Sequence, residues 1–107
     1  MPSSLPSSLQ QQLILDELFD LSLYRSFQRH ASPSLNPLLE SLAKTEVGHL
    51  TFWQDYFGIT VSRLDARRRA KLAIFQTLAS LFGDAAILWI VEIIEVHGVK
   101  KYLDLWG

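Results

Sequence analysis

The sequence contains no cysteine, which excludes disulfide bonds and thiolate metal sites. Glycine and proline are scarce, at five and four residues, and most of them stand where helices are expected to start or stop. The net charge of −1 gives no electrostatic attraction to nucleic acid or to an anionic membrane. The longest strongly apolar run, Ala85–Ile94, contains Glu92 and has about half the length of a membrane span. We therefore expect a soluble, cytoplasmic domain.

Hydrophobic residues make up 49% of the 107 residues, enough for one packed core. No segment shows the alternating pattern of a β-strand, so the expected fold class is all-α. The first residues are rich in serine and proline and lack the basic and apolar regions of a signal peptide. We expect a disordered leader over residues 1–7 and one helical domain over residues 8–107.

Four segments have helical spacing and helix-end signals, at residues 8–29, 36–57, 63–82 and 84–105. Pro37 suits the first turn of the second segment, and Gly58 and Gly83 suit helix C-termini. Ser62 and Asp65 are spaced like a capping box for the third segment. The fourth segment is apolar on all sides near its start, so it requires cover from a partner chain or a further segment.

Acidic residues occupy the apolar faces of three of these helices. Because each helical residue advances by about 100°, Glu17 falls in the middle of the first apolar stripe. Glu46 holds the same place on the second helix, and His49 shares its face. On the fourth helix Glu92 lies within the apolar stripe, with Glu95 one turn along. Three helices are thus predicted to turn carboxylates toward the core.

Burying unpaired carboxylates costs several kcal/mol each, and no lysine or arginine shares these stripes. A metal ion removes this cost, and carboxylate with imidazole suits iron or manganese. A single glutamate on an apolar stripe is usually a residue at the rim, and a lone Glu-x-x-His is common by chance. The occurrence of both features on several helices of one chain favours a metal site. We expect His30 to act at a helix C-terminus, His97 to be exposed and Asp20 to lie at the rim.

Three motifs resemble those of a known family. Glu17 is followed by Tyr24, Glu46-x-x-His49 by Phe52-Trp53, and Glu92-x-x-Glu95 by Tyr102. These patterns, over about residues 13–105, resemble the ferritin-like superfamily. Within it they are most similar to the rubrerythrin-type domains found in front of vacuolar iron transporter membrane domains.

The resemblance implies a partial ferritin-like bundle of about four helices, with residues 63–82 as the crossover. It implies iron, or manganese, bound by Glu17, Glu46, His49, Glu92 and Glu95, with Tyr24 and Tyr102 bonded to the ligands. Such di-iron carboxylate sites support ferroxidase-like or peroxidase-like activity, or iron capture and delivery. The family's second Glu-x-x-His is missing, so we expect a homodimer or higher oligomer, or a longer parent protein with a membrane iron-transporter domain.

A different class of function stays open. The chain would then be a non-metal helical dimerisation module, in which the buried carboxyls are protonated or hydrogen-bonded to Tyr24, Trp53 and Tyr102. Iron(II) titration separates the two interpretations, because only the first predicts binding.

Overall fold

The computed structural model describes residues 5–106, except for the side chains of residues 101, 102 and 104–106. Most of the predicted leader lies outside this range, and its last residue, Ser7, already belongs to a helix. The described residues form four helices and no strand: α1 (Ser7–Phe27), α2 (Asn36–Phe57), α3 (Ala66–Phe82) and α4 (Asp84–Trp106). The expectation of an all-helical bundle is confirmed.

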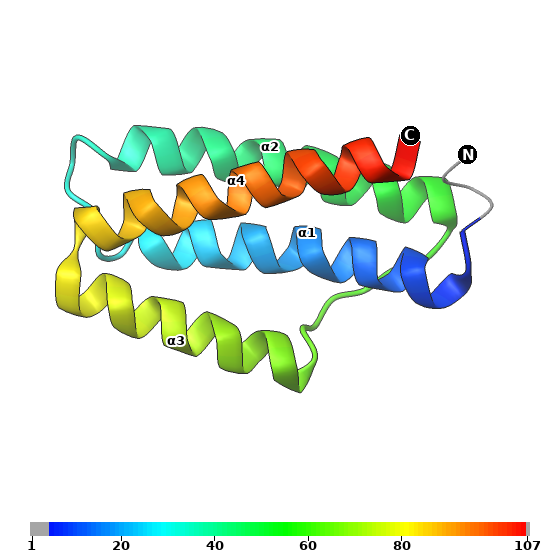
Figure 1. Cartoon of the computed structure of the whole chain (residues 1–107), viewed down its shortest axis with the longest axis horizontal. Helices are drawn as coiled ribbons and strands as arrows, with labels where there is room; N and C mark the ends of the chain where they lie inside the picture. The colour runs from blue at the N-terminus through cyan, green and yellow to red at the C-terminus, as the bar shows by residue number, and fades with distance from the viewer. Residues whose placement is uncertain (1–4, 107) are drawn as a thin grey trace.

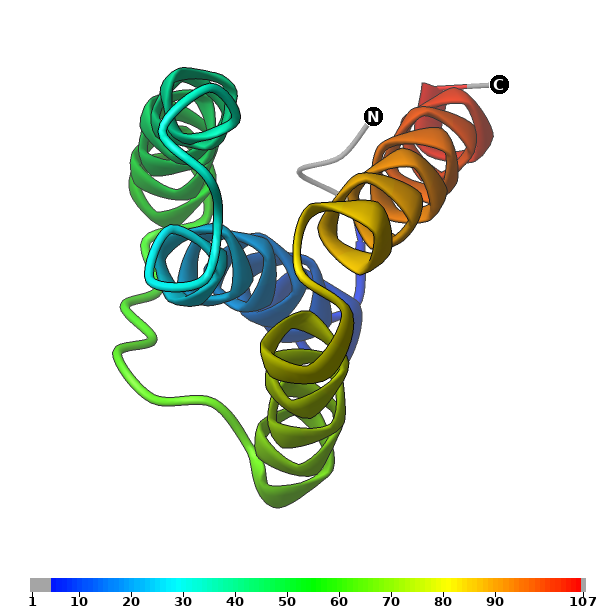
Figure 2. The same ribbon diagram turned by 90° about the vertical axis from the view of Figure 1, so that its left-hand side faces the viewer.

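The four helices run along the long axis of the molecule and alternate in direction (Figure 1). Helix α1 lies in the middle and packs against α2 on one side and α3 on the other, while α4 packs against α3. Seen from the end, α2 and α4 diverge above α1 (Figure 2). The segment predicted as a crossover, α3, therefore forms one wall of the bundle.

Local capping explains where the helices end. Gly58 follows α2 in the left-handed conformation, with φ of 68°, which a residue without Cβ adopts at no steric cost. The predicted start of α3 at Arg63 is wrong, because Asp65 is itself the N-cap and accepts a hydrogen bond from the Arg68 amide. The Arg68 guanidinium also binds Asp16 of α1 at 2.7 Å, which fixes the start of α3 to the central helix.

Two apolar clusters form the core along α1. The larger lies toward the C-terminal end of α1, where Tyr24 and Phe27 pack with Leu39 of α2 and Ile90 of α4. The smaller lies toward its N-terminal end and joins Leu13 and Ile14 of α1 to Trp53 of α2. Between the two clusters the chain places Glu17 and Glu46. The two apolar clusters are thus separated by a polar region that α1 and α2 both contribute to.

Helix α4 buries only one side. Its inner residues Ile87 and Ile90 are buried, whereas Trp89, Val96 and Leu103 are 63%, 65% and 67% exposed. This agrees with the expectation that a helix apolar on all sides is incompletely covered within one chain. None of the helices in the described part of the chain combines the length and apolarity of a membrane span.

Candidate metal centre

Helices α1 and α2 bring three predicted ligands together. Donor atoms of Glu17, Glu46 and His49 lie within 4.8 Å of one another. The His49 Nδ1 atom is 3.6 Å from Glu17 Oε2 and 3.7 Å from Glu46 Oε2. Donors that share a metal at about 2.1 Å are roughly 3.0–3.4 Å apart, so small side-chain shifts would close this group around an ion.

The helical framework fixes this arrangement. Glu46 and His49 are three residues apart, so they share one face of α2, and the antiparallel packing of α1 and α2 sets Glu17 opposite. Glu17 and Glu46 are only 3% and 5% exposed, because apolar clusters lie on both sides of them along α1. His49 is partly exposed and forms the open side of the group.

The environment of Glu46 strongly disfavours its charged form. Burial, then a hydrogen bond with Glu17 and repulsion from the Glu17, Asp20 and Glu95 carboxylates, raise its pKa to about 10. Its Oε2 atom is buried and has no hydrogen-bond partner among the described residues. Buried acceptor oxygens are nearly always bonded in native proteins. A cation bound between the carboxylates would satisfy this oxygen and offset the repulsion.

Helix α4 adds Glu95 to the centre. The Tyr24 hydroxyl donates a 2.5 Å hydrogen bond to Glu95 Oε1, as expected for a tyrosine that orients a ligand. Burial, and then this hydrogen bond, hold the pKa of Tyr24 well above its usual value. Glu95 also borders a cavity of about 130 Å³ together with Glu17, Asp20, Glu46 and His49. Four carboxyl groups and one imidazole therefore surround one small space.

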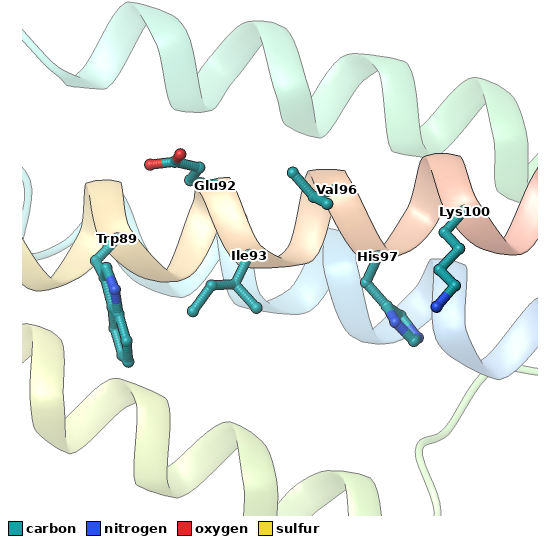
Figure 3. Close-up of a pocket in the computed structure, with 6 residues that line it drawn as sticks. All are labelled: Trp89, Glu92, Ile93, Val96, His97 and Lys100. Carbon is teal, nitrogen blue, oxygen red and sulfur yellow. The ribbon is translucent and has the colours of Figure 1, made fainter.

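Glu92 does not join this group. It is exposed and lines a shallow hollow on the outer side of α4 with Trp89, Val96 and Lys100 (Figure 3). The prediction that Glu92 faces the core is wrong, because the buried face of α4 is the one that carries Ile87, Ile90, Val91 and Ile94.

The sequence pattern predicts Asp20 at the rim of the site, and the structure places it, half-buried, on the wall of the cavity. The available signal was its spacing of three residues from Glu17. His30 and His97 are exposed, and the expectation for His97 is confirmed. The predicted hydrogen bond from Tyr102 falls on a side chain outside the described residues.

The donor set fits a hard or borderline divalent metal, because carboxylate oxygens and one imidazole nitrogen meet around a buried, unsatisfied oxygen. Comparisons with known proteins add no assignment: no family model, curated protein or solved structure matches the chain.

Proposed function

We propose that this chain is a ferritin-like, rubrerythrin-type domain that binds iron(II) through Glu17, Glu46 and His49 and serves iron capture or delivery. One observation carries the proposal. Two opposed glutamates, each more than nine-tenths buried, lie within 4.8 Å of a histidine. One of the buried carboxylate oxygens lacks a hydrogen bond within the described part of the chain.

The ligand supply favours capture over oxidation of iron. Glu17, Glu46 and His49 provide three donors for one ion, and Glu95 provides a fourth once its carboxylate turns from Tyr24. A second iron needs further donors, and among the described residues only Asp20 is added at this cavity. Reaction with oxygen in di-iron proteins depends on two metals held close together. Binding of one iron per chain is therefore the central expectation.

Anaerobic titration of the metal-free protein with iron(II) should show one tight site per chain. Because a ligand that binds only the folded state stabilises it by mass action, free iron(II) at a hundredfold excess over Kd should add about 2.7 kcal/mol of stability. Differential scanning calorimetry should show a higher Tm with iron(II) and a return to the metal-free Tm after addition of a chelator.

Calcium provides the control, because it prefers six to eight oxygen ligands and is poorly served by an imidazole. Iron(II) should raise the Tm at concentrations where calcium does not. Equal melting curves with iron(II), calcium and chelator, together with no iron retained after dialysis, would contradict the proposal.

A second candidate, a helical dimerisation module without metal, has its own support. Glu95 accepts a hydrogen bond from Tyr24, and the raised pKa of Glu46 favours its neutral form. Both carboxyl groups can therefore be buried in part without an ion. The exposed apolar side of α4 suits a partner helix. This candidate gives no account of the unbonded Glu46 oxygen, and iron(II) titration distinguishes it from the first.

A further inference from the structure

The candidate metal centre lies between α2 and α4, two helices that do not pack closely against each other. We refer to the space between these helices, above Glu17 and Glu46, as the channel. The two helices diverge above α1 (Figure 2), and the cavity at the centre is bordered by His49 from α2 and by Glu95 and Val99 from α4. On α2, residues at intervals of three and four from His49 share its side of the helix. The exposed apolar residues of this side include Leu38, Phe52 and Tyr56. Apolar side chains thus stand on the α2 wall at both ends of the centre.

The outer side of α4 has a matching pattern. Ala85, Trp89, Glu92, Val96, Val99 and Leu103 follow one another at intervals of four, three, four, three and four residues, and all are exposed. This heptad spacing is typical of a helix face that packs against another helix. Its middle position is the exposed carboxylate Glu92, which projects from α4 on the edge opposite to Trp89 and Ile93 in Figure 3. The same chain thus has a ligand group that opens between α2 and α4 and an exposed apolar helix face with a carboxylate at its middle.

We propose that α4 of a second copy of this chain occupies the channel between α2 and α4, and that the partner subunit's Glu92 completes the metal centre. The inference rests on the proposed function, since it assigns a further ligand to the same ion. Each subunit both receives a helix and inserts one, so the contact is reciprocal and closes as a dimer.

The surface available suits this arrangement. From Ala85 to Leu103 the outer side of α4 is about 27 Å long and, at the usual spacing of packed helices, roughly 10 Å wide. One contact strip between two α4 helices therefore covers only about 270 Å², against about 800 Å² per partner in a stable interface. Reciprocal insertion makes three such strips. Helix α4 packs against the partner's α4 and against the partner's α2, and α2 packs against the partner's α4. Together they reach the required area.

Symmetry sets the level of the new ligand. We place the twofold axis of the dimer along the helices, so that the two α4 helices run parallel. The partner subunit's Glu92 then lies three residues, about 4.5 Å along the axis, from the level of Glu95. That offset is within the reach of a glutamate side chain. No other acidic residue occurs on the exposed heptad positions of α4 from 85 to 103.

Charge makes the dimer dependent on metal. The centre already holds Glu17, Glu46, Glu95 and Asp20, so an additional carboxylate is repelled in the absence of a cation. Iron(II) reverses this effect, because one ion binds carboxylates from both chains. Binding and association are then linked, and each strengthens the other.

Glu92→Gln should therefore have opposite effects on the two processes. Sedimentation equilibrium without metal should show a dimer at least threefold tighter than that of the parent, because a repulsive charge is lost. Anaerobic iron(II) titration should show binding at least tenfold weaker, because a ligand is lost. A residue with a purely structural role would shift both in the same direction. Asp55→Asn, an exposed carboxylate on the outer side of α2, is the matched control and should change neither.

Mixing of two defective chains tests whether Glu92 acts across the interface. Glu92→Gln keeps the three central ligands, and Glu46→Gln keeps Glu92. After subunit exchange at equal concentrations, half of the dimers are mixed and each holds one complete centre, so about a quarter of the parent's tight iron sites should return. No recovery would overturn the inference, because a ligand acting within its own chain cannot be supplied by the partner.

The dimer surface has its own control. Val96→Glu on the outer side of α4 should leave a monomer in the presence of iron(II), whereas Ile74→Glu, which alters a similarly exposed residue of α3, should leave the dimer. A parent that binds iron(II) as a monomer overturns this inference and leaves the proposed function intact. A parent that dimerises but binds no iron(II) contradicts the proposed function itself.

Discussion

Glu46→Ala should abolish iron(II) binding, and His49→Ala should weaken it strongly. Burial and the neighbouring carboxylates raise the pKa of Glu46, and its Oε2 atom lies 3.7 Å from His49 Nδ1. Loss of partners that merely orient metal ligands weakens binding by about 10–100-fold, so loss of a ligand should exceed about a hundredfold. Competition with a chromogenic iron(II) chelator measures the affinities of the variants.

Asp55→Ala provides the control, because this exposed carboxylate lies on α2 but outside the centre. It should bind iron(II) like the parent. The assignment of the ligands is wrong if Glu46→Ala and His49→Ala both retain the parent's affinity while their circular dichroism spectra remain helical.

The helix ends marked by glycine and the central ligand group could be predicted from the sequence because local rules determine them. Gly58 and Gly83 follow α2 and α3 with positive φ angles of 68° and 63°. The sequence pattern predicts both glycines at the C-termini of helices. Glu17, Glu46 and His49 were placed correctly on inward faces because α1 and α2 each have one apolar stripe. Where a helix has a single apolar side, periodicity determines which residues face the core.

The orientation of α4 could not be predicted in this way. Its first half is apolar on all sides, so two stripes compete, one with Ala85, Val96 and Leu103 and the other with Ile87, Ile90 and Ile94. Packing against α1 and α3 buries the second stripe. That choice turns Glu95 inward and Glu92 outward, and it depends on contacts distant in sequence. The wrong prediction for Glu92 and the exposed apolar surface of α4 therefore have the same cause, which is that α4 is apolar on more than one side.

Removal of the ionisable group at Glu46 should stabilise the metal-free protein above neutral pH. The folded-state pKa of Glu46 is raised from 4.5 to about 10, so between these values the folded chain holds a proton that the unfolded chain has released. Stability therefore falls as pH rises across this window, by at most about 1.4 kcal/mol per pH unit for one proton. Glu46→Gln keeps the shape of the side chain and removes this dependence. Urea denaturation with a chelator present should show the variant about 2–4 kcal/mol more stable than the parent at pH 8.

At pH 4.5 the two proteins should have nearly equal stability, because Glu46 is then protonated in the folded chain and half protonated in the unfolded chain. At pH 8 Asp55→Asn should have the stability of the parent, since this side chain is exposed. Parallel curves for the parent and Glu46→Gln would show that burial does not hold a proton on Glu46. With iron(II) in excess the order should reverse at pH 8, because the ion displaces that proton and stabilises only the chain that keeps the Glu46 carboxylate. The same substitution thus stabilises the metal-free protein and destabilises the iron-loaded one, a change of sign that a merely structural glutamate would not produce.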